Sequence, residues 1–231
     1  SPSPSKKQKR HRKPSRYADP SKYAHLAELQ DIFAPGLIAI FVGFNPGVAT
    51  ATAGHAYAHP SNMFWKLLHT SGLTPDRRLR PEEDGTLPAL YALGNTNLVA
   101  RPSRDVAELS KEEMAAGTPI LEAKVRKWRP EAVCIVGKAI WESIWRWKHG
   151  RAIRKDEFRY GWQDERENMG RITGIERDEN GKACEELSSQ GPWEGARVFV
   201  ATSTSGLSAS LKPAEKEAIW KPFGNWVQER R

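Results

Sequence analysis

One short stretch carries residues that could position water for a hydrolysis. Residues 43–47 read Gly-Phe-Asn-Pro-Gly and follow an apolar run over residues 37–42. Pro46 fixes its own φ angle and biases Asn45 toward an extended backbone, while the flanking glycines permit a tight turn. The Asn45 amide offers one acceptor and two donors and does not titrate, so it can hold a water molecule in one orientation at any ordinary pH. Such a group suits a reaction whose difficulty lies in the leaving group.

Two other interpretations of this stretch stay open. Asparagine commonly hydrogen-bonds its own turn beside Pro and Gly, and Asn45 could do only that. The stretch also resembles a loop that cradles phosphate before a helix, which would indicate a nucleotide-binding α/β protein. Against the second interpretation, the full Gly-x-Gly-x-x-Gly and Walker patterns are absent from the sequence.

The elements that must position Asn45 indicate a parallel sheet. Residues 37–42 are a continuous apolar run, and similar runs recur at 132–136 and 198–201. Continuous rather than alternating apolar runs are typical of strands buried on both faces. Asn45 would then lie at the carboxyl end of a central strand, where open α/β sheets bind their ligands. The expected fold class is therefore α/β.

Spacing and capping patterns predict the helices between the strands. Apolar spacing predicts a short amphipathic helix within residues 17–36, packed on an edge of the sheet. The Ala, Thr and Gly residues of 48–58 predict a loop in which small side chains leave room for a flat ring. Further helices are expected from Asn62 to Gly72, from Ser110 with a break at 117–119, from Lys138, and from Pro213 with a break near Gly224.

Length and charge suggest one domain with a basic tail. The chain has 231 residues, 39% of them hydrophobic, which suffices for one core over residues 17–231. Seven Lys and Arg side chains and no acid lie within residues 1–16, and they account for all but one of the eight net positive charges. A segment of this composition should be disordered. It could serve as a nuclear localisation signal, bind DNA phosphates non-specifically, or only increase solubility. The charged stretch at about 149–195 is interpreted as an insertion of unknown role, with a hairpin turn at 180–181.

Several classes of protein are disfavoured. The two cysteines and six histidines show no ligand-like spacing, so neither a disulfide framework nor a metal site is expected, and a reducing compartment fits. Nothing approaches the length of a membrane span, and no secretory signal is visible. Because the chain begins with Ser1 rather than Met, we expect it to be part of a longer protein.

Three segments, in order, resemble a known family. Residues 43–47, with His-Pro-Ser-Asn-Met-Phe-Trp-Lys at 59–66, closely resemble the first signature of the mismatch-specific uracil and thymine DNA glycosylases, a branch of the uracil-DNA glycosylase superfamily. Residues 94–99 (Gly-Asn-Thr-Asn-Leu-Val) match its Thr-Asn segment, and residues 201–208 (Ala-Thr-Ser-Thr-Ser-Gly-Leu-Ser) resemble its second signature in the bacterial form. The likeness spans roughly residues 37–227. It implies a eukaryotic member with a three-layer α/β/α sandwich and a short, mostly parallel central sheet.

The resemblance implies roles for single residues. Asn45 would direct the water, and Asn97 would read the edge of a pyrimidine, although an asparagine there could be only a turn former. Tyr57 would stack on the flipped base, with ordinary packing as the alternative; such stacking contributes about 1–3 kcal/mol. His55 could instead contact phosphate or cap a helix. The expected base pocket consists of Phe44, Thr50, His55, Tyr57 and Asn97.

The second signature implies the contacts with DNA. Leu207 matches the apolar wedge that bacterial relatives insert into the base stack, and a plain surface loop of Ser and Thr would not need it. Ala209 and Thr202 depart from the family pattern, so the residue that reads the opposite base is not assigned. Contacts with phosphate are expected from Ser205, Gly206, Ser208 and Lys138, although a solvated Lys138 is an equal alternative.

The function implied is that of a monofunctional DNA glycosylase. It would flip out and excise uracil or thymine mispaired with guanine, and other modified pyrimidines, by water attack on C1′, which initiates base excision repair. No lysine of the two signatures stands out as a Schiff-base nucleophile, which predicts base release without strand cleavage. No carboxylate occupies the motif to assist the water, which predicts slow turnover on a normal base. We expect a nuclear monomer acting on double-stranded DNA with G·U or G·T mismatches, without metal or cofactor. The alternatives are a non-catalytic DNA-binding module of the same fold and the nucleotide-binding protein.

Overall fold

A five-stranded sheet forms the centre of the molecule. The structure, a computed structural model, describes residues 16–174, 191–208 and 210–231. The strand order is β2-β1-β3-β5-β4. The first four of these run parallel, and β4 pairs antiparallel with β5 at one edge. The strands are β1 (Ala39–Gly43), β2 (Leu93–Asn97), β3 (Ala132–Val136), β4 (Gly161–Trp162) and β5 (Arg197–Ala201).

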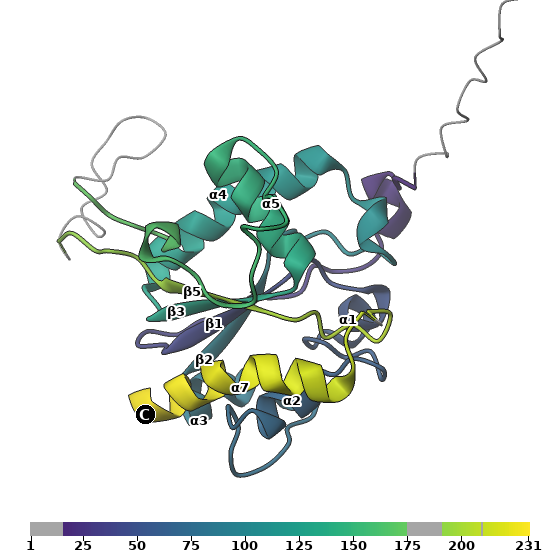
Figure 1. Cartoon of the computed structure of the whole chain (residues 1–231). Helices are drawn as coiled ribbons and strands as arrows, with labels where there is room; N and C mark the ends of the chain where they lie inside the picture. Colours follow the sequence, from purple (N-terminus) through teal and green to yellow (C-terminus); the bar gives the residue numbers. More distant parts are fainter. Residues whose placement is uncertain (1–15, 175–190, 209) are drawn as a thin grey trace, which may run out of the picture.

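Helices cover both faces of the sheet. Figure 1 shows α4 and α5 on one face and α2, α3 and α7 on the other, with α1 beyond the end of the sheet. The helices are α1 (Val48–Ala53), α2 (Phe64–Thr70), α3 (Leu87–Tyr91), α4 (Lys111–Trp128), α5 (Lys138–His149) and α7 (Pro213–Arg230). Short 3₁₀ turns are η1 (Pro20–Tyr23), η2 (Pro81–Thr86), η3 (Val106–Glu108) and η4 (Glu165–Glu167). The predicted three-layer α/β/α architecture is confirmed.

The apolar run of β1 is buried on both faces, as its composition indicates. Ala39 and Phe41 pack into a core cluster with α2 and α7, while Ile40 and Val42 pack into a second cluster with α4 and α5. Successive side chains of a strand point to opposite faces, so one continuous run serves two cores. The turn after β1 is therefore anchored by a strand that cannot shift without disturbing both cores.

Two local predictions are wrong. Residues 24–36 form no helix, because Leu29 packs into the core cluster of α2 and α7 whereas Phe33 stacks on Trp128 of α4 across the sheet edge. A single helical stripe could not reach both sides. Ile32 forms an antiparallel bridge with Asn95, so the segment does cover the sheet edge as expected. Residues 48–53, predicted as a loop, form α1, since alanine favours helix and Gly54 ends it at φ 71°.

The two predicted helix breaks are also wrong. Helix α4 runs through Pro119, and α7 runs through Gly224, without interruption. In each case the glycine allows a close approach rather than a break. A Cβ on Gly117 would collide with the Leu98 carbonyl, and one on Gly224 would collide with the Ser71 carbonyl.

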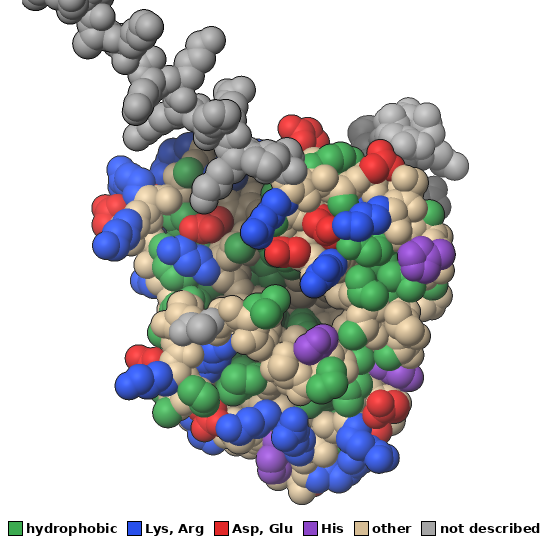
Figure 2. All heavy atoms as spheres, turned by 90° about the vertical axis from the view of Figure 1, so that its right-hand side faces the viewer, with side chains coloured by type: hydrophobic (Ala, Val, Ile, Leu, Met, Phe, Trp, Pro, Cys, Tyr) green, Lys and Arg blue, Asp and Glu red, His purple; other side chains and the backbone are tan. Residues whose placement is uncertain are grey.

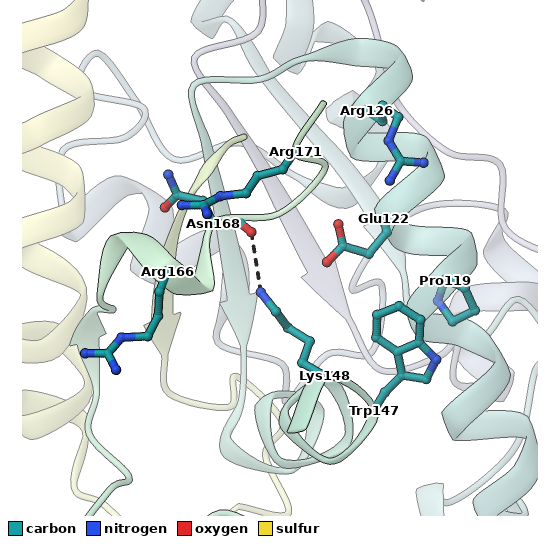
Figure 3. Close-up of a pocket in the computed structure, with 8 residues that line it drawn as sticks. All are labelled: Pro119, Glu122, Arg126, Trp147, Lys148, Arg166, Asn168 and Arg171. Carbon is teal, nitrogen blue, oxygen red and sulfur yellow. Dashed lines mark hydrogen bonds between the residues drawn. The ribbon is translucent and has the colours of Figure 1, made fainter. Parts of the chain in front are cut away.

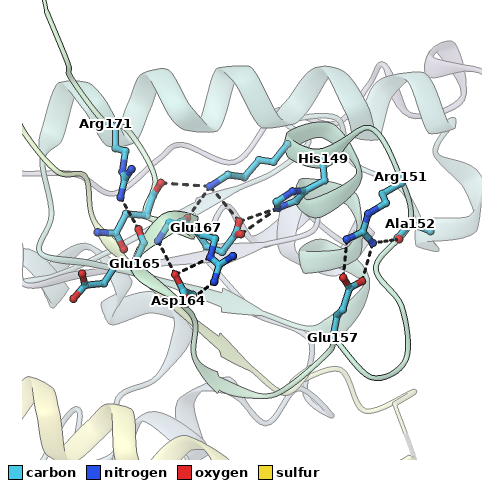
Figure 4. Close-up of polar contacts among 11 residues, drawn as sticks. His149, Arg151, Ala152, Glu157, Asp164, Glu165, Glu167 and Arg171 are labelled. Atoms are coloured by element: carbon cyan, nitrogen blue, oxygen red, sulfur yellow. Dashed lines mark hydrogen bonds and ion pairs between the residues drawn. The ribbon is translucent and has the colours of Figure 1, made fainter.

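The charged stretch after α5 is built into the fold where it is described. It supplies the edge strand β4, and Met169 and Ile172 are buried. The nearly buried Glu167 carboxylate lies 3.1 Å from His149 Nε2 and 3.6 Å from Lys148 Nζ (Figure 4). Residues 1–15, the predicted turn at 180–181 and Ala209 lie outside the described residues. Within the described ranges, no helix has the length and apolarity to cross a membrane.

Candidate active site

A large cavity opens at the carboxyl ends of the parallel strands. Its volume is about 1000 Å³, and the end of the molecule that carries it faces the viewer in Figure 2. This is where open α/β sheets bind ligands. Ten of the eleven predicted site residues line it: Phe44, Asn45, Thr50, Tyr57, Asn97, Lys138, Ser205, Gly206, Leu207 and Ser208. The structure therefore brings together segments that lie far apart in the sequence.

The Asn45 amide is held in one orientation. Its Nδ2 donates to the carbonyl of Arg101 at 2.9 Å and to Ser103 Oγ at 2.8 Å. Ser103 Oγ donates its own hydrogen to the Asp105 carbonyl at 2.9 Å, so it can only accept from Asn45. Both partners demand the NH₂ group, and Oδ1 makes no hydrogen bond with any described residue. The amide oxygen is thus left to accept a hydrogen bond inside the cavity.

Asn97 lies at the end of β2, beside the turn after β1. It is the register partner of Gly43. A Cβ on Gly43 would come within 2.5 Å of Asn97 Oδ1 and 3.1 Å of the Tyr57 hydroxyl. No hydrogen bond joins the Asn97 side chain to another residue in the described part of the chain. Glycine at position 43 therefore makes room for an amide that is available to a ligand.

Tyr57 forms part of the cavity wall with its ring supported from behind. Its ring stacks on Phe64 with centroids 3.8 Å apart and an interplanar angle of 15°. The residue has φ 53°, an uncommon value outside glycine. Burial raises the pKa of its hydroxyl, which has no hydrogen-bond partner among the described residues. Thr50 is buried, and its Oγ1 accepts from the amide of Ala58, the residue after Tyr57, at 3.3 Å.

His55 is the predicted pocket residue that the structure does not bring to the cavity lining. Its Nδ1 lies 3.1 Å from Asp84 Oδ1, and the other oxygen of that buried carboxylate accepts from the Ala56 amide at 2.8 Å. Asp84 thereby ties down the loop between α1 and α2. His55 supports the loop that presents Tyr57, and its predicted contact with the base has no support in this geometry.

The two signature segments are joined to each other. The Met63 amide donates to the Thr204 carbonyl at 2.8 Å, and a Cβ on Gly206 would collide with Ser61. Within the loop, the Leu207 amide donates to Ser205 Oγ at 3.3 Å. Leu207 itself is 88% exposed, an unusual position for a large apolar side chain. The loop is thus fixed at its base and presents leucine at its tip.

The charges of the cavity lining are mostly positive. Arg104, Lys138 and Lys216 line it, together with the carboxylate of Asp105. Lys138 lies 3.8 Å from Glu142 and over the ring of Phe158, so it is already partly engaged. Lys216 is 3% exposed, and its Nζ donates to the Ser208 carbonyl at 3.0 Å; burial lowers its pKa. Asp105 Oδ1 accepts from the Ala107 amide, which turns this carboxylate toward its own 3₁₀ turn.

Comparison with known proteins decides the family. The sequence model of the uracil DNA glycosylase superfamily matches residues 31–224. The chain belongs to this superfamily. It is 36% identical over 210 residues to a protein of Schizosaccharomyces pombe named "G/U mismatch-specific uracil DNA glycosylase". That alignment covers 90% of the chain and 56% of the relative, so the chain spans little more than half the length of the relative it matches.

Three residues of this superfamily member matter to the site but were not predicted. The carbonyl of Arg101 and the hydroxyl of Ser103 hold Asn45, and Lys216 holds the Leu207 loop through Ser208. Arg101 and Ser103 follow β2 closely, so their position at the same end of the sheet was a usable signal. Lys216 lies in the first turn of a helix that carries no motif, and nothing in the sequence marked it.

A second, smaller cavity does not add to this site. It has a volume of about 360 Å³ and lies between α4, the end of α5 and residues 166–171 (Figure 3). Its cations are engaged by the protein: Lys148 donates to the Glu167 carbonyl, Arg166 pairs with Asp164, and Arg171 donates to the Glu165 carbonyl. These contacts indicate a structural role in which the stretch after α5 is held against the helices.

Proposed function

We propose that the protein is a monofunctional DNA glycosylase that removes uracil mispaired with guanine from double-stranded DNA. The orientation of Asn45 is the observation that carries the proposal, because a locked, non-titrating amide with a free oxygen is suited to aim one water molecule. The name of the Schizosaccharomyces pombe relative supports G·U as the substrate. We extend the proposal to thymine in G·T and to other modified pyrimidines, since a cavity of about 1000 Å³ has room for a pyrimidine with a further substituent.

In the proposed reaction, the target nucleotide first leaves the helix. Flipping costs a few kcal/mol, and less for a mispaired base, so selection begins before the pocket is reached. Leu207, which is exposed on a fixed loop, fills the space left in the stack. Cationic side chains at the rim, such as Arg104 and Lys138, attract the phosphates.

Water then replaces the base at C1′. The water donates a hydrogen bond to Asn45 Oδ1, which orients it. The oxygen of the water then forms a bond to C1′, and the electron pair of the glycosidic bond leaves with the pyrimidine. The Asn97 amide and main-chain groups near Phe44 hold the departing base and stabilise its negative charge. The proton lost by the water passes to solvent or to the base. Asp105 caps its own turn with Oδ1 and lies 3.8 Å from Arg16 with Oδ2, and the signature segments carry no carboxylate, so we propose a reaction without a general base and with slow turnover.

The test is single-turnover release of uracil from a duplex with one G·U pair. Asn45→Ala should lower the rate constant on the order of 10²-fold and leave DNA affinity unchanged, because only the aim of the water is lost. Asn168→Ala, an asparagine at the second cavity, is the matched control and should release uracil at the normal rate. Unchanged release by Asn45→Ala would remove Asn45 from the mechanism. Wild-type binding without any release would instead indicate a non-catalytic DNA-binding module.

The same assay tests the monofunctional character. Abasic strands should break only after alkali, because Lys66 of the first signature pairs with Glu217 at 3.1 Å and does not line the cavity, while Lys216 is bound to Ser208. Breaks before alkali would contradict this part of the proposal. We further propose that the protein acts as a monomer in the nucleus, with residues 1–16 as a basic address or phosphate grip.

A further inference from the structure

Arg101 connects Asn45 to helix α4. Its carbonyl accepts from Asn45 Nδ2, while its guanidinium reaches away from the cavity. There, Nε and Nη2 donate to the two oxygens of Glu113 at 2.6 and 3.0 Å, and Nη2 also donates to the Glu108 carbonyl at 3.2 Å. The Arg101 side chain is only 13% exposed. This two-point geometry fixes the plane of the guanidinium as well as its position.

Glu113 also closes the first turn of α4. Its carboxylate accepts from the Ser110 amide at 2.7 Å, and its own amide donates to Ser110 Oγ at 3.1 Å, which is a complete capping box. One carboxylate therefore serves both the helix start and the arginine. The Arg101 guanidinium is the main reason that the pKa of Glu113 lies below its ordinary value.

Helix α4 is a firm support for this contact. Leu121 and Val125 are buried in its core cluster, and Gly117 lies against the Leu98 carbonyl just after β2. The other partner of Asn45, Ser103, lies on the same short loop as Arg101 and is two residues away. The position of that loop relative to the helix thus depends on Arg101.

We propose that Glu113 and Arg101 are positioning residues for base release: the Glu113 carboxylate sets Arg101, whose main chain sets the Asn45 amide. This inference rests on the proposed function, because it requires Asn45 to act in the reaction. It predicts that loss of the ion pair slows the chemical step while the DNA contacts of Lys138 and the Leu207 loop, which lie on other segments, are kept.

Three variants separate the ion pair from the helix cap. Glu113→Gln removes the charge that binds Arg101 but keeps a capping box, because glutamine serves at that position. Ser110→Ala removes one cap bond and keeps the ion pair. Glu112→Gln makes the same charge change at the neighbouring exposed residue. The measurements are single-turnover uracil release from a G·U duplex, DNA affinity and melting temperature.

Glu113→Gln should lower the rate constant by about tenfold or more with DNA affinity within about twofold, as expected when a reacting group is slightly misplaced. Ser110→Ala should lower the melting temperature and leave the rate of the folded protein unchanged, and Glu112→Gln should change neither. In an Asn45→Ala background, Glu113→Gln should not lower the rate constant of uracil release any further, because its effect passes through Asn45.

A normal rate for Glu113→Gln would overturn the inference, as would equal loss in the folded Ser110→Ala variant or an undiminished further loss in the Asn45→Ala background. The wild-type protein and Asn45→Ala distinguish the two proposals. If the wild-type protein releases no uracil, the proposed function fails. If Asn45→Ala releases uracil at the normal rate, the role of Asn45 fails and that of Glu113 fails with it; if Asn45→Ala is inactive while Glu113→Gln is normal, only the role of Glu113 fails.

Discussion

Two asparagines at the same end of the sheet have opposite surroundings. Asn45 donates to two fixed acceptors of the protein, whereas the Asn97 amide has no hydrogen bond to a described residue. The Asn45 amide therefore has its orientation before DNA binds, so it need not reorganise during the reaction. The second can turn its amide to suit the base that arrives. This division matches the proposed roles of aiming water and holding a pyrimidine.

Gly43 provides the test of this arrangement at the residue scale. In Gly43→Ala the new methyl group would lie 2.5 Å from Asn97 Oδ1 and 3.1 Å from the Tyr57 hydroxyl, so the Asn97 amide must shift and Tyr57 must give way slightly. We expect single-turnover uracil release to fall by at least about tenfold, since misplacement of this size is costly. Gly85→Ala is the control, because Gly85 is exposed with nothing within 4 Å of the added atom, and its release rate should be normal. Normal release by Gly43→Ala would show that the pocket tolerates the methyl group.

Sequence reasoning found the site residues that end strands and missed those held by distant partners. Asn45 was placed correctly because a buried apolar run ends just before it, and Asn97 was placed at the same cavity through the resemblance of residues 94–99 to the family segment. His55 was assigned to the pocket, but Asp84, 29 residues later, holds it outside the lining. A contact between two loops, such as that of His55 with Asp84, produces no periodicity or motif in the sequence. Ser103 was missed although its position shortly after β2 was a usable signal, because no motif marks a hydroxyl in a loop.

At the scale of elements, the glycines inside α4 and α7 show what sequence could not supply. Glycine and proline predicted breaks in both helices, yet Gly117 and Gly224 lie where a neighbouring carbonyl touches the helix backbone. The buried strands β1, β3 and β5 and the helix start at Ser110 were predicted correctly because their signals are local, whereas the two-residue edge strand β4 was not predicted. The path of residues 24–36 was not, because Leu29 and Phe33 pack on different sides of the sheet.

Gly117→Ala tests the close approach of α4. Alanine normally stabilises a helix by about 1 kcal/mol over glycine, but here its methyl group would collide with the Leu98 carbonyl. We expect a net loss of about 1–3 kcal/mol in the free energy of unfolding, as for overpacked cores. Ala116→Gly, on the exposed side of the same helix, should cost about 1 kcal/mol. Chemical denaturation measures both, and a stabilised Gly117→Ala would contradict the packing argument.

The Leu207 loop is an element whose role can be separated from stability. Because the side chain is 88% exposed, Leu207→Ala should leave the melting temperature unchanged. Uracil release from a G·U duplex should fall several-fold more than release from a single strand, since only the duplex has a stack to fill. An equal effect on both substrates would reject the wedge role.

At the scale of the molecule, acidic pH should weaken the contact between the turn η1 (Pro20–Tyr23) and Glu108 of η3. Hydrogen bonds from Lys22 at 2.5 Å and Tyr23 at 2.7 Å lower the pKa of Glu108 to about 2. A carboxyl whose pKa is lower in the folded state contributes stability above its unfolded value of about 4.3, and the contribution is lost as pH falls toward 2. Unfolding measured from pH 5 to pH 2 should show this loss. The free energy of unfolding should fall less steeply between pH 5 and pH 2 in Glu108→Gln than in the wild type. In Glu112→Gln it should fall as steeply as in the wild type.

The two borders of the sheet are both closed by short pieces of chain. On one side β4 has only two residues, and on the other Ile32 makes a single bridge to Asn95. Among the described residues, β4 is too short to support a long added strand, and the bridge from Ile32 covers the middle of β2. The folded protein at high concentration should therefore resist fibril growth and strand exchange between molecules. If either occurs, we expect it to begin at the edge of β2, where opening of the bridge between Ile32 and Asn95 frees main-chain groups.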